Sequence, residues 1–154
     1  MHVLLCRIDD VRYALRLQDV VEVVRAAAVV PIPGAPPVVL GLLDLRGEPV
    51  PVLDARRRFG HPMRALHPDE HFVVARAGDR PVALRVDRAD TLGTLDEAAL
   101  EDPRRHVVGA RHVDGVVALD DGLVLLHDVR TFLAATEADA LDEALRAMTA
   151  DARA

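Results

Sequence analysis

The chain has 154 residues, of which 51% are hydrophobic and only 3% aromatic, and its formal net charge is −6. This length and composition indicate a folded protein of one domain or two small lobes, and the shortage of aromatic residues favours sheet cores of Val, Leu, Ile and Ala. The acidic balance argues against broad nucleic-acid binding, and the absence of Ser and Lys excludes a serine nucleophile, a Schiff-base lysine and a Walker lysine.

The amino-terminal stretch carries information about the compartment. Cys6 is the single cysteine, which excludes an internal disulfide and fits a reducing cytoplasm. The apolar residues 1–6 end at Arg7, so this stretch is too short for a signal peptide or a membrane span. We therefore expect a cytoplasmic protein.

Three β-hairpins are predicted from apolar residues that alternate around a turn. Alternation of period two is typical of strands with one buried face, and Asp and Gly supply the turns. The hairpins are expected at residues 4–17, 71–87 and 115–126.

The two halves of the chain resemble each other. Residues 13–20 match 82–89, and residues 41–47 and 109–115 both read Gly-x5-Gly. Asp54 and Asp128 each follow an apolar strand and can cap a short helical turn. We therefore predict two similar β lobes, in which the repeated structural positions are Gly41, Gly47, Gly109, Gly115, Asp54 and Asp128.

Helix is expected mainly at the carboxyl terminus. Residues 96–103 predict one or two turns that start at Asp96 and stop at Pro103. Residues 136–148 predict an amphipathic helix with a capping box formed by Thr136 and Asp139. This helix either packs against its own domain or binds a partner or a second copy.

Candidate catalytic groups are few. His67 and His71 have the spacing of a zinc-binding helix, but Pro62 and Pro68 interrupt helix there, and Cys6 reads as a buried hydrophobe. The run 56–58 is three arginines, which we interpret as the solvated face of a turn or as a contact patch. The residues therefore favour an all-β binding module of two five-stranded barrels, without a catalytic site, metal or cofactor; the competing hypothesis is a small metal- or thiol-dependent enzyme.

The segment 41–60 contains the candidate contact. Pro49 and Pro51 cannot donate ladder hydrogen bonds, which predicts a free strand edge or a bulge. Arg46 has no counterpart in the second half, where Asp114 stands at its place. We therefore predict that Arg46 serves a partner rather than the fold.

Residues 20–60 resemble the CheW family, the adaptors of bacterial chemosensory arrays. The resemblance rests on a Val-x-Glu-Val strand, a hydrophobic-Pro-x-Ala-Pro loop, a Leu-Arg-Gly block after Gly and a Pro-Val strand ending in Asp, found here at 20–23, 32–36, 41–47 and 50–54. The segments 82–95 and 115–133 are similar to later strands of the family. Asp44 departs from the Asn often found in the motif, and His127 replaces an acidic or apolar residue.

The resemblance implies two SH3-like five-stranded β-barrel subdomains in residues 1–134, with a boundary near 61–70 and strands that can exchange between the lobes, followed by an acidic amphipathic helix at 135–154. It implies an adaptor that couples methyl-accepting chemoreceptors to a CheA-type histidine kinase at arrays on the inner membrane. The receptor-side residues would be Val20, Glu22, Gly41, Asp44 and Arg46, and apolar lobe surfaces would take the kinase's CheW-like regulatory domain. The alternatives are a scaffold of a non-chemotaxis array and a freestanding, self-associating β module.

Overall fold

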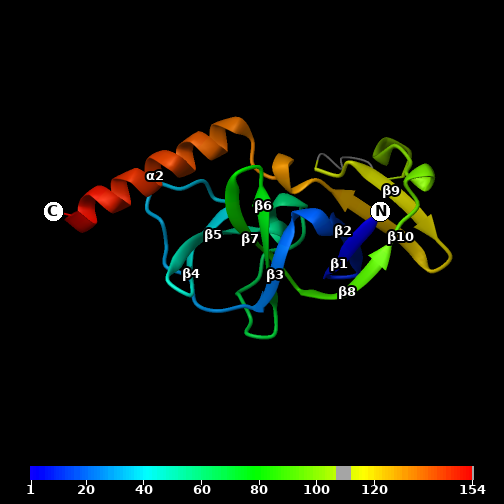
Figure 1. The fold of residues 1–154 in the computed structure, drawn as a ribbon, viewed down its shortest axis with the longest axis horizontal. Helices are drawn as coiled ribbons and strands as arrows, with labels where there is room; N and C mark the ends of the chain where they lie inside the picture. The colour runs from blue at the N-terminus through cyan, green and yellow to red at the C-terminus, as the bar shows by residue number, and fades with distance from the viewer. Residues whose placement is uncertain (107–111, 154) are drawn as a thin grey trace.

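A computed structural model of the chain describes residues 1–106 and 112–153, and the strands within these ranges form two five-stranded sheets (Figure 1). Sheet A contains β1 (His2–Ile8), β2 (Val11–Arg16), β8 (Arg88–Thr94), β9 (Gly115–Leu119) and β10 (Gly122–His127). Sheet B contains β3 (Val20–Arg25), β4 (Val39–Leu45), β5 (Glu48–Asp54), β6 (His71–Ala77) and β7 (Arg80–Val86). The helical elements are η1 (Leu17–Asp19), α1 (Ala55–Arg58), η2 (Glu97–Ala99), η3 (Pro103–Arg105), η4 (Val129–Thr131) and α2 (Ala135–Arg153).

Both sheets have the same topology. Sheet A runs β8-β1-β2-β10-β9 and sheet B runs β3-β6-β7-β5-β4. Hairpin β1–β2 therefore corresponds to β6–β7, and hairpin β9–β10 to β4–β5; in each sheet the two hairpins meet through a parallel pair, β2 with β10 and β7 with β5. The predicted internal repeat is present as a repeated strand order. Its predicted match of Gly47 with Gly115 is wrong, because Gly47 lies in the turn between β4 and β5, whereas Gly115 is the first residue of β9. The turn of sheet A that corresponds to Arg46 and Gly47 is formed by Asp120 and Asp121, so Asp114 is not the counterpart of Arg46.

One strand of each repeat crosses to the other sheet. β3 follows β2 along the chain but pairs with β6, and β8 follows β7 but pairs with β1. Residues 61–70 lie between β5 and β6, which both belong to sheet B, so the chain passes between the sheets at 16–20 and 86–88 instead. The turn signals at 61–70 mark a loop inside one sheet.

The predicted all-β class with two five-stranded units is confirmed. In neither sheet do the two outermost strands share a ladder within the described residues, so the sheets are open rather than closed barrels. The free-edge prediction for the prolines is also right. Pro49 and Pro51 pair only with β4, because the contact of β5 with β7 begins at Val52.

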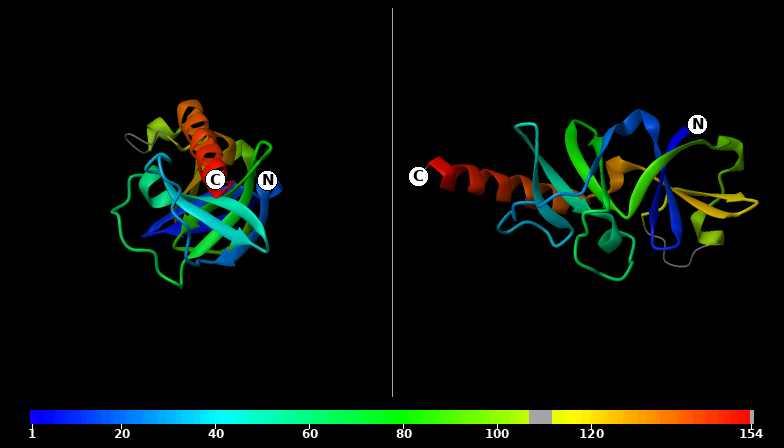
Figure 2. Two further views of the ribbon diagram at one scale, coloured as in Figure 1. Left: turned by 90° about the vertical axis from the view of Figure 1, so that its left-hand side faces the viewer. Right: turned by 90° about the horizontal axis from the view of Figure 1, so that it is seen from below.

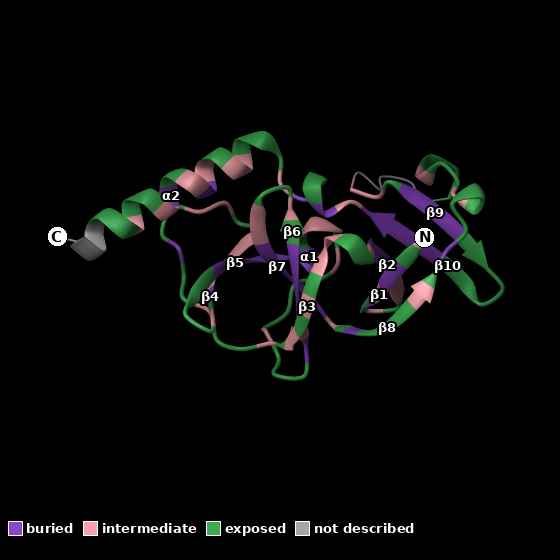
Figure 3. Cartoon of the chain, in the orientation of Figure 1, coloured by how far each residue is buried: buried purple, intermediate pink, exposed green. Residues whose placement is uncertain are grey.

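The sheets pack face to face over a shared core, and each covers a smaller core with its other face. Figure 3 shows buried residues in strands of both sheets. Alternation explains this arrangement, because successive side chains of a strand point to opposite faces. The shared core includes Leu4, Cys6, Tyr13 and Leu15 from sheet A and Leu53, Val73, Val82 and Leu84 from sheet B.

Helix α2 lies along the sheet B lobe and carries the carboxyl terminus away from sheet A (Figures 1 and 2). Leu141 is fully buried and Ala144 is 7% exposed, and both pack against Ile32. The helix therefore packs on its own domain through the predicted apolar face. Among the described helices, none is long and apolar enough to cross a membrane.

The helix ends differ from the sequence prediction in two places. The capping box of Thr136 and Asp139 is wrong, because α2 begins at Ala135 and the Glu137 carboxylate accepts the Ala134 N–H at 2.9 Å. The segment 96–103 forms η2 and leads into η3, and Pro103 starts η3 instead of ending a helix. Proline suits the first helical position because that N–H needs no partner within the helix.

Candidate functional site

The β4–β5 turn holds Arg46 in an uncommon backbone conformation. Arg46 has φ 52° and Gly47 has φ 87°, as in two-residue turns whose central residues both take positive φ. The Asp44 carboxylate accepts the Gly47 N–H at 2.7 Å, which fixes the turn from within. A residue other than glycine is uncommon at positive φ, so the turn presents an arginine at some conformational cost.

Arg46 forms a bidentate ion pair with Glu22 of β3. Its Nη1 and Nη2 donate to Glu22 Oε1 and Oε2 at 3.0 and 2.6 Å. The Arg46 hydrogen bond holds the pKa of the Glu22 carboxyl below its usual value, and the carboxylate in turn raises the pKa of Arg46. Because β3 and β4 are the two outer strands of sheet B, this pair bridges the open side of the sheet.

The pair remains accessible to a partner. The Arg46 side chain is 69% exposed and that of Glu22 is 30% exposed. Next to Glu22, β3 also exposes Val21 and Val23 at 55% and 36%. The strand edge thus combines an ion pair with apolar side chains at the surface.

Gly41 is required by packing. Its φ is 155°, and a Cβ atom there would lie 2.4 Å from the carbonyl oxygen of Val30. Val30 and Leu42 exchange both backbone hydrogen bonds, at 2.9 and 2.7 Å, so the two segments cannot easily separate. Gly41 therefore lets the loop before β4 approach the strand.

The structure brings three of the five predicted receptor-side residues together, namely Glu22, Asp44 and Arg46. Gly41 lies farther along β4 against Val30, and Val20 is half-buried beside the shared core. The sequence motif thus mixes surface groups with residues that shape the backbone.

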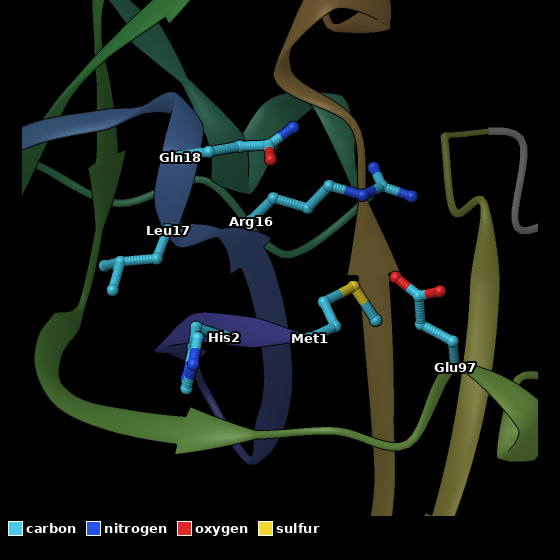
Figure 4. Close-up of a pocket in the computed structure, with 6 residues that line it drawn as sticks. All are labelled: Met1, His2, Arg16, Leu17, Gln18 and Glu97. Atoms are coloured by element: carbon cyan, nitrogen blue, oxygen red, sulfur yellow. The ribbon is translucent and has the colours of Figure 1, made fainter.

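A hollow of about 440 Å³ lies where the chain passes from β2 to β3 (Figure 4). The Arg16 Nη1 atom is buried there without a hydrogen-bond partner in the described part of the chain. Alternation along β2 sets Arg16 on the same face as Arg12, but no pattern in the sequence indicates the hollow. The hollow is lined by Met1, His2, Arg16, Leu17, Gln18 and Glu97.

The two repeated aspartates, Asp54 and Asp128, have the same role, since each caps a short helical turn as predicted. Asp54 caps α1 by accepting the Arg56 and Arg57 N–H groups at 3.0 and 3.5 Å, and Asp128 caps η4 by accepting that of Arg130 at 3.0 Å. A Cβ at Gly115 would lie 2.9 Å from Leu100. The remaining glycine, Gly109, lies outside the described residues.

Arg56 is buried at the joint between the lobes, so interpreting the whole run 56–58 as a solvated face or a contact patch was wrong. It is 2% exposed and donates to Asp9 and Asp87, each at 2.9 Å, and to the carbonyl of Pro62. Although burial lowers it, these carboxylates raise the pKa of Arg56 overall. His61 lies beside Arg56 in this contact region between the lobes, and its Nδ1 is 3.2 Å from Asp9 Oδ2.

Arg58 is also partly buried, at 14% exposure, and pairs with Glu137 of α2 at 2.5 Å. Its guanidinium lies 5.7 Å from the centre of the Phe132 ring. Arg57 is the member of the run that is exposed. The sequence could not separate these three because they share one side-chain type.

The residues that the enzyme hypothesis would use, Cys6, His67 and His71, do not form a common site. Burial raises the pKa of the Cys6 thiol to about 12, so it carries almost no thiolate at neutral pH. His71 Nδ1 accepts the Ala89 N–H at 2.8 Å, and His67 Nδ1 accepts that of Asp69 at 3.0 Å. No group of three metal-binding side chains occurs within residues 1–106 and 112–153.

A model of the CheW-like domain family matches residues 2–137. The chain belongs to the CheW-like domain family. Among curated relatives, the Chemotaxis protein CheW of Treponema pallidum is 26% identical over 131 residues, which are 81% of this chain and 77% of that protein. Protein FrzA of Myxococcus xanthus is 30% identical over 112 residues, 72% of this chain and 70% of that protein.

The fold has a counterpart among solved structures. The crystal structure of the scaffolding protein TtCheW from Thermoanaerobacter tengcongensis matches with a TM-score of 0.78 over 88% of this chain and 94% of that one. At 24% identity this likeness establishes the CheW fold alone.

Proposed function

We propose that this chain is a chemosensory adaptor that joins the cytoplasmic tip of methyl-accepting chemoreceptors to a CheA-type histidine kinase. The observation that carries this proposal is the CheW-like domain match over residues 2–137, together with relatives named as chemotaxis proteins. The protein would act by binding, in the cytoplasm, and would be recruited to receptor arrays at the inner membrane without inserting into it.

The receptor-side contact would centre on the Glu22–Arg46 pair. A guanidinium has five N–H donors, and Glu22 occupies two of those of Arg46, so a receptor carboxylate could bind the same side chain. The exposed Val21 and Val23 would add apolar contact beside it. The kinase's CheW-like regulatory domain would use apolar surface elsewhere on the lobes.

The proposal is tested by co-sedimentation of the full chain with a receptor cytoplasmic fragment and CheA. Arg46→Glu should abolish recovery with the receptor fragment while leaving recovery with CheA unchanged. Arg57→Glu is the matched control, since Arg57 is exposed on α1 and forms no ion pair in the described structure.

A charge swap separates a contact role from a structural one. Glu22→Arg combined with Arg46→Glu restores an ion pair of reversed polarity across sheet B. If the pair only holds the sheet together, the swap rescues receptor binding; if Arg46 meets a receptor carboxylate, it does not. Failure of the wild-type chain to bind either partner would refute the adaptor assignment and direct attention to another array or to self-association.

A further inference from the structure

Three arginines form a row across three neighbouring strands of sheet A. Arg7 of β1 lies directly opposite Arg12 of β2 on one side and Arg88 of β8 on the other. Residues that pair directly across strands share a face, with Cβ atoms about 5 Å apart. Like charges in this arrangement destabilise a sheet, so the row has a cost.

The two outer arginines have carboxylate partners and the middle one has none. Arg12 binds Asp121 through both terminal nitrogens at 3.2 and 3.0 Å, and the Arg88 Nε lies 3.4 Å from Asp90. Arg7 is exposed and forms no ion pair within the described part of the chain. Carboxylates thus already bind the two outer arginines of the row, whereas Arg7 at its centre has no carboxylate partner in the described residues.

The row surrounds a shallow hollow of about 180 Å³. Thr91 and Leu5 form part of its wall, on the same face as the arginines. The pairing of β1 with β8 skips Asp90, and this bulge sets Arg88 opposite Arg7. Bulges commonly re-aim a side chain next to a functional site.

The internal repeat supplies a comparison within the molecule. Strands β1 and β6 both begin with His and carry Arg at the sixth residue, so Arg76 is the counterpart of Arg7. Arg76 lies opposite Pro81 of β7, not another arginine. The same topology thus forms without an arginine row, which means that the fold does not require one.

We propose that the row of Arg7, Arg12 and Arg88 is a docking site for an acidic helix of a partner protein. Neighbouring strands are about 4.8 Å apart, and carboxylates at i and i+4 of a helix are about 6 Å apart, so such a helix can reach two neighbouring arginines. Arginine binds carboxylates with paired hydrogen bonds.

This site is distinct from the proposed receptor-side pair in sheet B and can be tested without receptor or kinase. The probe is a fluorescein-labelled peptide of Glu-Ala-Ala-Ala-Glu repeats, with a glutamine version of the same peptide and a short DNA duplex as comparisons. Binding to the full chain is measured by anisotropy at low salt for wild type, Arg7→Glu and the matched control Arg76→Glu. Thermal unfolding of each variant is recorded alongside.

The glutamate peptide should bind wild type and Arg76→Glu equally and Arg7→Glu at least about fivefold more weakly, as for reversal of an exposed charge. The glutamine peptide should not bind, and Arg7→Glu should unfold at the same or a higher temperature because it relieves repulsion. Equal weakening in both variants, or DNA binding as tight as that of the glutamate peptide, would overturn the proposal. A lower unfolding temperature for Arg7→Glu would overturn its premise.

Discussion

Replacing Arg85 with methionine removes the cation from a buried cluster in sheet B. Arg85 is 2% exposed and donates to Glu70 at 2.8 and 3.2 Å and to Asp54 at 3.4 Å. Its Nη2 also donates to the carbonyl of Arg64 at 3.0 Å. Methionine fills much of the same volume, so the change tests the charge rather than the packing.

The expected loss of folding free energy follows from the two carboxylates that stay buried in the variant. Glu70 and Asp54 are 2% and 0% exposed, so both carboxylates would stay buried without their shared partner. Removing one partner of a buried ion pair costs about 3–5 kcal/mol, and we expect Arg85→Met to lie near the middle of this range. Glu70→Gln should cost less, about 3 kcal/mol, because Asp54 still faces the guanidinium.

Urea unfolding followed by circular dichroism measures these differences. With a slope of about 2 kcal/mol per molar urea, Arg85→Met should lower the midpoint by about 2 M. The exposed strand arginine Arg76 provides the control, and Arg76→Met should change stability by less than about 0.5 kcal/mol.

The double variant Arg85→Met with Glu70→Gln decides whether the two residues act as a pair. Since it leaves fewer unpaired charges, it should cost about 2 kcal/mol less than the sum of the single changes. Additive costs, or a cost for Arg85→Met as small as that of Arg76→Met, would refute this account.

Three further predictions concern single residues. Burial lowers the pKa of His127 below its usual 6.5, so the folded chain binds fewer protons than the unfolded one at acidic pH. The chain should therefore lose stability as the pH falls below about 6.5. Melting temperatures measured at several pH values should depend less on pH in His127→Phe than in the wild type. Gly41→Ala should cost about 2 kcal/mol or more of stability in urea unfolding, because its Cβ would clash with the Val30 carbonyl. Gly47→Ala should cost only about 1 kcal/mol, because a Cβ there meets nothing within 4 Å. Equal costs would contradict the packing role of Gly41. Leu141→Ala should cost about 2–4 kcal/mol by the same measurement, and a cost below about 1 kcal/mol would mean that α2 is only loosely attached.

The hairpins could be predicted because their signals are local. Tyr13 and Leu15 alternate with Ala14 and Arg16, and Asp9 takes the positive φ that its turn needs. The exchange of β3 and β8 between the sheets could not be predicted, because the choice of pairing partner depends on segments far away along the chain. A crossing strand has the same alternation whichever sheet receives it.

The candidate site was predictable in part. The motif identified Arg46 and Glu22, but their contact needed the three-dimensional arrangement, since β3 and β4 are outer strands on opposite sides of sheet B. Buried charges were the main failure. Arg56 stands in a run of arginines that predicts exposure, and no sequence pattern marks Arg85 as buried. Both are buried because carboxylates that are distant in the sequence pair with them.

The order of strands along the chain also bears on how the protein is made. Sheet B is complete within residues 20–86, so it can assemble as soon as this continuous segment has left the ribosome. Sheet A must wait for β8, β9 and β10, and until then hairpin β1–β2 has both of its edges unpaired. Exposed edges invite pairing with other chains, so hairpin β1–β2 needs protection from such pairing while sheet A is incomplete.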